Sequence, residues 1–235
     1  DMTEHRDKLC VALDGSDRDW IVDTARELAP HVGWLKLGLE AFTAFGPDLV
    51  AEMADSGRVF FDIKLHDIPT TVRRAAANCA ATGAAMFNVH ASGGREMLSA
   101  AVEGAREGAA ADPPLVIAVT VLTSLDARAL AELGLSSDPE RLVTMLAATA
   151  KEVGLDGVVA SAQEAADIRR VCGDDFLIVT PGIRPAWSAE DDQRRVMTPS
   201  DAIAAGADIL VVGRPITGAD RPAAAAARVL DELDG

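Results

Sequence analysis

The sequence predicts an α/β fold, a single-domain (β/α)₈ TIM barrel over residues 1–235, and three observations lead to this prediction. Short apolar runs alternate with longer segments of helical periodicity, and this pair recurs eight times along the chain. Several of the runs are apolar at every position, which is typical of parallel strands that are covered on both faces. The length is close to the ~250 residues that such a barrel usually takes.

Eight short apolar runs are the strand candidates, and in chain order they are Leu9–Leu13, Trp34–Leu37, Val59–Lys64, Met86–His90, Leu115–Val121, Gly157–Ala160, Leu177–Thr180 and Ile209–Val212. Between them, apolar residues recur at helical spacings of three and four. One such segment follows Asp17 and contains Trp20, Ile21, Ala25 and Leu28. A later one follows Pro139, a residue type suited to a first helical turn, and contains Leu142, Leu146, Ala150 and Val153.

The competing α/β fold, a doubly wound sheet for dinucleotides, has a glycine-rich turn after its first strand. Here the first strand candidate is followed by Asp14-Gly-Ser16, without a GxGxxG pattern, so the barrel is favoured. The longest connection without a clear pattern runs from Ile183 to Met197. Loops of that length are uncommon and often act as lids over a site.

The charge balance excludes two classes of partner. The chain has 22 Lys and Arg against 37 Asp and Glu, a formal net charge of −15. A protein this acidic is repelled by nucleic-acid phosphates and by anionic membrane surfaces, so we expect it to bind neither. No apolar run approaches the ~20 residues of a membrane span, and the first eight residues are charged where a signal peptide is apolar. We therefore expect a cytoplasmic protein.

No cofactor or metal is expected either. The three cysteines, Cys10, Cys79 and Cys172, are far apart and lack CxxC spacing, which indicates buried reduced thiols rather than a disulfide framework or a zinc site. The four histidines form no HxH or HExxH pattern. His66 is expected to face solvent, whereas His90, at a strand end, either lines the pocket or is structural.

Charged residues gather where strands are expected to end, and in a barrel the carboxyl ends of the strands face the active site. The two-residue period of a strand directs Asp62 and Lys64 to the same side, and Lys36 ends the preceding strand candidate. Asp67 follows the strand and must project from a loop, from which it could reach a neighbouring subunit. Only four basic residues are lysines, and two of them fall in this set. Since an unpaired buried charge is costly, we expect these residues to form an alternating catalytic array; a purely structural ion-pair network is the alternative.

Candidates for binding a phosphate lie after the seventh and eighth strands, where barrels commonly hold one with backbone N–H groups. They are the Pro181-Gly182 turn and Gly213-Arg214, in which the arginine offers a forked donor. Arg184 and Gln193 are placed to help from the long loop.

These segments together resemble the orotidine 5′-phosphate decarboxylase family of the bacterial type. The resemblance centres on Asp62-Ile-Lys-Leu-His-Asp67-Ile-Pro-Thr-Thr71 and extends in the family's order over the whole barrel. The other matching segments are Val11–Asp14, Lys36–Gly38, Asn88–Ala91, Val119–Ser124, Thr180–Arg184, Gln193 and Val212–Arg214. A DxKxxD pattern alone would be shared with related sugar-phosphate decarboxylases and aldolases.

The resemblance implies cofactor-independent decarboxylation of orotidine 5′-phosphate to uridine 5′-monophosphate, the last step of de novo pyrimidine synthesis. It makes Lys64 the proton donor to C6 of the pyrimidine, places Asp62 at the substrate carboxylate, and completes the array with Lys36 and Asp67. It also implies a homodimer in which Asp67 and Thr71 serve the partner's site. The implied substrate-binding residues are Asp14, Lys36, Asp62, Lys64, Asp67, Ile68, Thr71, Thr123, Ser124, Pro181, Arg184, Gln193, Gly213 and Arg214.

Two alternatives stay open. One is a magnesium-dependent sugar-phosphate decarboxylase or hexulose phosphate synthase of the same superfamily, although those relatives lack the Ile-Pro-Thr-Thr tail of the motif. The other is a barrel that binds nucleotides without turning them over. Sensitivity to a chelator separates the first alternative from the decarboxylase, and binding without turnover identifies the second.

Overall fold

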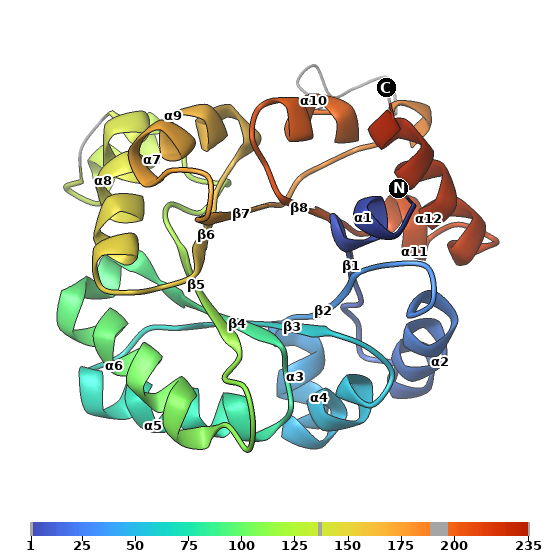
Figure 1. Cartoon of the computed structure of the whole chain (residues 1–235), viewed down its shortest axis with the longest axis horizontal. Coiled ribbons are helices and arrows are strands. Elements are labelled where there is room, and N and C mark those ends of the chain that lie inside the picture. The colour runs from blue at the N-terminus through green and yellow to red at the C-terminus, as the bar shows by residue number, and fades with distance from the viewer. Residues whose placement is uncertain (1, 136–137, 189–196, 235) are drawn as a thin grey trace.

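A computed structural model of the chain describes residues 2–135, 138–188 and 197–234. Eight parallel strands pair in chain order and the last pairs with the first, so the sheet closes into a barrel with the helices around it (Figure 1). The strands are β1 (Leu9–Ala12), β2 (Trp34–Leu37), β3 (Val59–Leu65), β4 (Met86–His90), β5 (Leu115–Val119), β6 (Gly157–Val159), β7 (Leu177–Thr180) and β8 (Ile209–Val212). The predicted fold class is confirmed.

The strand boundaries agree with the prediction to within two residues. β5 ends at Val119 rather than Val121, β1 and β6 each end one residue early, and β3 continues one residue further, to Leu65. The helices are α1 (Met2–Asp7), α2 (Arg18–Leu28), α3 (Leu39–Phe45), α4 (Pro47–Ala54), α5 (Pro69–Ala81), α6 (Gly94–Gly108), α7 (Ala127–Glu132), α8 (Pro139–Glu152), α9 (Ala162–Cys172), α10 (Pro199–Ala204), α11 (Arg214–Thr217) and α12 (Pro222–Asp231). Short 3₁₀ turns occupy Ala91–Gly93, Ala186–Ser188 and Glu232–Asp234.

Local sequence signals account for where several helices begin. The side chain of Asp17 accepts a hydrogen bond from the backbone N–H of Trp20 and caps α2, and Pro139 occupies the first turn of α8. α9 starts with a capping box in which Ser161 and Glu164 satisfy each other's backbone N–H groups. These caps hold the helices that return the chain to the next strand.

Apolar side chains fill two regions, one between strands and helices and one inside the barrel. The inner cluster consists of Cys10, Trp34, Phe60, Met86, Ile117, Val179, Ile209 and Val211. Two residues beyond Trp34, Phe60 and Met86, three adjacent strands carry Lys36, Asp62 and Asn88. Because side chains on a strand alternate between its faces, these polar residues form the next layer above the apolar plug.

The three cysteines are free and buried, as expected, and burial raises the pKa of Cys79 to about 12. Within the described residues, no helix combines the length and the apolar character that a membrane span requires.

Candidate active site

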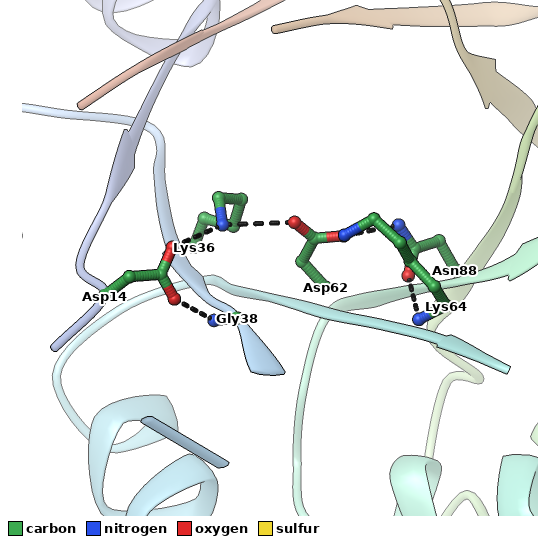
Figure 2. Close-up of polar contacts among 6 residues, drawn as sticks. All are labelled: Asp14, Lys36, Gly38, Asp62, Lys64 and Asn88. Carbon is green, nitrogen blue, oxygen red and sulfur yellow. Dashed lines mark hydrogen bonds and ion pairs between the residues drawn. The ribbon is translucent and has the colours of Figure 1, made fainter. Parts of the chain in front are cut away.

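Four charged side chains form one chain of ion pairs at the carboxyl ends of β1, β2 and β3 (Figure 2). The Lys36 ammonium lies 2.8 Å from Oδ2 of Asp14 and 3.1 Å from Oδ2 of Asp62. The Lys64 ammonium lies 2.5 Å from the other oxygen, Oδ1, of Asp62. The Asp62 carboxylate therefore lies between two lysines, and Asp14 extends the row on the far side of Lys36.

Burial and charge pairing shift the pKa values of Lys36 and Asp62 in opposite directions, and the effect of pairing is the larger of the two. The Lys36 and Asp62 side chains are 10% and 14% exposed. Burial alone would lower the pKa of Lys36, but Asp62 and Asp14 raise it above its usual value. Burial alone would raise the pKa of Asp62, but Lys36 and Lys64 hold it below its usual value. Both groups are therefore charged at neutral pH.

The backbone at Lys64 departs from a regular strand. Its φ is +54°, which makes it the one residue other than glycine with a positive φ in the part of the chain that the structure describes. The register between β3 and β4 shifts between Phe61 and Leu65. The two-residue period on which the sequence prediction depended is thus interrupted at Lys64, although its ammonium reaches Asp62 as predicted. Ile63 packs against the outer core, on the opposite side.

Asn88 on β4 is a part of this site that the sequence analysis did not single out. It is fully buried, donates from Nδ2 to Oδ1 of Asp62 at 2.8 Å, and accepts the backbone N–H of Lys64 at 2.7 Å (Figure 2). The signal that could have found it is its position two residues after Met86, on the inward face of a strand beside the Asp62 strand.

Three adjoining cavities extend from the charged row across the carboxyl ends of the later strands. The first, of about 200 Å³, is lined by Lys36, Asp62 and Lys64 and by apolar side chains that include Val119 and Val211. The second, of about 330 Å³, shares Thr123 and Pro181 with the first. The third, of about 380 Å³, shares Gly182 with the second and Val211 with the first. Their shared lining residues place the three cavities side by side, and we call them together the cleft.

The third cavity is the cationic end of the cleft. Arg184, Gly213 and Arg214 line the third cavity, and Gly213 immediately precedes α11. Gly182 has a φ of +79°, a conformation in which a glycine avoids the strain of a larger residue. Thr123 lines the first two cavities, whereas Ser124 is exposed in the same loop. Gln193 lies outside the described residues. Four of the predicted phosphate candidates therefore line the third cavity, namely Gly182, Arg184, Gly213 and Arg214, whereas Pro181 lines the first cavity beside the lysines.

A family model described as "Orotidine 5'-phosphate decarboxylase / HUMPS family" matches residues 7–229. The chain belongs to this family. It is 48% identical to the orotidine 5′-phosphate decarboxylase of Syntrophotalea carbinolica, over 99% of this chain and 97% of that protein, and 50% identical to that of Moorella thermoacetica, over 97% and 93%. The crystal structure of orotidine 5′-phosphate decarboxylase from Lactobacillus acidophilus superposes with a TM-score of 0.86 at 36% identity, covering 97% of this chain and 99% of that one. The resemblance stated from the motifs is confirmed.

The family motif continues into a loop that lies outside the charged row of a single chain. Asp67 is exposed, and its carboxylate accepts the backbone N–H of Ile68. Among the described residues it forms no ion pair with either lysine of the row, and within one chain Asp14 occupies the end of the array instead. Ile68 is 67% exposed, and Thr71 is exposed as well. The role of Asp67 and Thr71 in a partner's site stays a prediction.

Two histidines flank the row. His66 is exposed, as expected, and its ring centroid lies 5.4 Å from that of the half-buried His90. Burial, and then the neighbouring His66 and Lys64, lower the pKa of His90 below its usual value, so its imidazole is neutral at pH 7. In the described residues, no group of three or more His, Cys, Asp or Glu is arranged to hold a metal ion.

Proposed function

We propose that this family member is a cytoplasmic enzyme that converts orotidine 5′-phosphate to uridine 5′-monophosphate and CO₂, the last step of de novo pyrimidine synthesis, without a cofactor. The single observation that carries the proposal is the Asp62 carboxylate held between the Lys36 and Lys64 ammonium groups at the floor of a cleft. The names of the relatives, which are orotidine 5′-phosphate decarboxylases at close to half identity, support it.

In the proposed reaction the bond between C6 and the carboxylate breaks, CO₂ leaves, and the electron pair remains on C6. A fixed ammonium beside C6 stabilises that developing charge without having to reorganise. Lys64 then transfers a proton from Nζ to C6, which completes uridine 5′-monophosphate. Its ion pair with Asp62 at 2.5 Å orients the ammonium before the substrate arrives.

The cleft suggests how the substrate lies. The pyrimidine and its carboxylate occupy the first cavity, against Asp62, Lys64 and the apolar wall. Asp14 and Lys36 contact the ribose, and Thr123 and Ser124 the pyrimidine edge. The phosphate binds at the cationic end, to Arg184, Gln193, Gly213 and Arg214. Since this end is remote from C6, its binding energy is available to align the reacting groups.

We also propose a homodimer in which Asp67 and Thr71 enter the partner's site. Their exposure beside the strand that carries Lys64 supports this arrangement. Sedimentation velocity measures the assembly directly. Mixing Asp67→Ala subunits with Lys64→Ala subunits tests the shared site, because a mixed dimer has one site with neither substitution. Activity regained on mixing supports the proposal, and none regained contradicts it.

The decisive experiment incubates the purified protein with orotidine 5′-phosphate in the presence of a chelator and follows the decrease in ultraviolet absorbance. Steady turnover is the expected result, and Lys64→Ala is expected to abolish it while the protein stays folded. Turnover of a sugar phosphate that stops with the chelator would indicate the magnesium-dependent alternative. Binding of uridine 5′-monophosphate by a protein that turns nothing over would indicate a nucleotide-binding module.

A further inference from the structure

Asn88 is fully buried and uses both ends of its side-chain amide on the two residues that the proposed reaction needs most (Figure 2). Its Oδ1 accepts the backbone N–H of Lys64 at 2.7 Å, and its Nδ2 donates to Oδ1 of Asp62 at 2.8 Å. The same Asp62 oxygen accepts the Lys64 ammonium at 2.5 Å. Backbone and side chain of Lys64 are thus joined through Asn88 and Asp62 into one closed ring of hydrogen bonds.

The first contact explains how the backbone of Lys64 is held in an unusual conformation. A lysine with a φ of +54° is in the left-handed region, which non-glycine residues adopt only when their surroundings require it. The ladder between β3 and β4 is interrupted there, between Phe61 and Leu65. The N–H of Lys64 is bound by a side chain instead, and without Asn88 it would lie partly buried and unpaired.

The second contact fixes the orientation of the Asp62 carboxylate. Oδ2 of Asp62 faces Lys36 at 3.1 Å, while Oδ1 receives both Asn88 and Lys64. A carboxylate free to rotate would let the Lys64 ammonium move with it. The amide N–H of Asn88 opposes that rotation and so determines the direction in which the ammonium is presented.

We propose that Asn88 is a positioning residue that holds Lys64 for proton transfer. The inference rests on the proposed function and deepens it. Of the uncharged side chains of this size, an amide supplies one donor and one acceptor side by side, as the two contacts require. An aspartate would preserve the acceptor for Lys64 but would place a second carboxylate oxygen against Asp62. Alanine would supply neither contact.

The test compares Asn88→Ala and Asn88→Asp with the wild-type protein, using Thr120→Val as a matched control. Thr120 is also buried, at 4% exposure, and its hydroxyl donates one hydrogen bond, to the carbonyl of Val159 rather than to any residue of the charged row. Asn88→Ala is expected to lower kcat by about 100-fold, the order of loss that a misplaced reacting group produces. The affinity for uridine 5′-monophosphate, measured by calorimetry, is expected to stay unchanged, because the substitution does not alter the proposed phosphate-binding residues. Thr120→Val is expected to retain both.

The pH profile of Asn88→Asp gives a readout that a merely structural residue would not change. A protonated aspartic acid again offers one O–H donor and one carbonyl acceptor, so it reproduces the amide. The ratio of its kcat to that of the wild type is therefore expected to rise as the pH falls from ~9 to ~6. This near-isosteric variant also carries the test if Asn88→Ala does not fold, as judged by circular dichroism.

Four outcomes would overturn the inference: wild-type kcat in Asn88→Ala, an equal loss in Thr120→Val, a parallel loss of nucleotide affinity, or a pH-independent ratio for Asn88→Asp. Failure of the proposed function is distinguishable from each of these, because the wild-type protein itself would then show no turnover.

Discussion

Replacing Asp62 with alanine is expected to destabilise the protein as well as inactivate it. The substitution removes the carboxylate that pairs with both Lys36 and Lys64, of which the Lys36 side chain is only 10% exposed. Removing one partner of a buried ion pair costs ~3–5 kcal/mol, because the other charge is left uncompensated. Here Lys36 keeps Asp14 at 2.8 Å, and the Lys64 side chain, 26% exposed, can turn to water. We therefore expect the lower end, about 3 kcal/mol, or a fall in Tm of about 6–12 °C for a chain of this size.

The stabilisation that the charged row provides is expected to change with pH, and the pKa shifts give the direction of that change. The pKa of Asp62 lies below its ordinary value of 3.8, so its pairing contributes fully above that value and is lost as the pH falls through the folded pKa. The pKa of Lys36 lies above its ordinary value of 10.5, so its contribution is present below that value and is lost as the pH rises through the folded pKa. The difference between wild type and Asp62→Ala should thus be largest between these two values and shrink beyond either end.

Urea unfolding followed by circular dichroism, without substrate, measures that difference across the pH range. Glu107→Ala is the control, because Glu107 pairs with Arg73 on the surface, where both side chains are about half exposed and pairing contributes little. If Asp62→Ala and the wild type unfold with the same free energy at pH 7, the row of charges is solvated and the reasoning about it fails.

Four further outcomes are expected. Lys64→Ala should lose turnover while calorimetry shows unchanged binding of uridine 5′-monophosphate, and weakened binding would contradict the role given to Lys64. Arg214→Ala should lower kcat/KM for orotidine 5′-phosphate but not for orotidine, which has no phosphate to bind, and an equal loss for both would place Arg214 elsewhere. Ser161→Ala removes the capping box of α9 and should lower the free energy of unfolding by about 1 kcal/mol in urea, whereas no change would mean that the cap is dispensable. Arg169→Met removes hydrogen bonds to four backbone carbonyls and to the Asp208 carboxylate, all in the segments before β7 and β8. Its Tm should therefore fall, while kcat measured below the unfolding transition should be retained. An unchanged Tm would contradict a stabilising role for Arg169.

Much of the fold could be predicted because strands and helices have characteristic local patterns of apolar residues. Short, mainly apolar runs located all eight strands, and the eightfold alternation of strand and helix, together with the missing GxGxxG pattern, favoured a barrel over a doubly wound sheet. The strand ends could be predicted less well. β5 ends at Val119, although the predicted strand continues to Val121, because the sequence of a strand does not indicate where its hydrogen bonds to the neighbouring strands stop. After β2 the structure has two helices, α3 and α4, separated at Gly46, whose φ is +74°.

The charged row could be predicted in part, for a physical reason. Strand ends and the two-residue period are local, and they brought Lys36, Asp62 and Lys64 together. The contacts of Asn88 depend instead on the register of β3 against β4, and the left-handed backbone of Lys64 depends on a shift in that register. The residue pattern of a single strand predicts neither the contacts of Asn88 nor the backbone conformation of Lys64. The sequence places Asp14 among the substrate-binding residues but not in the charged array, because its ion pair with Lys36 arises from packing between the strand ends of β1 and β2.

The charges divide the cleft into two ends with different roles. Within one chain the charges of two lysines and two aspartates cancel, and in the proposed dimer Asp67 would add a negative charge, so the row cannot by itself attract an anion to a protein of net charge −15. At the other end, neither Arg184 nor Arg214 is paired with a carboxylate within the described part of the chain. For the proposed substrate, the attraction must therefore come from this end, where Arg184 and Arg214 concentrate positive charge. In the proposed reaction, the row would interact more strongly with the charge that develops at C6 than with the substrate in its ground state, which is the condition for raising kcat rather than affinity.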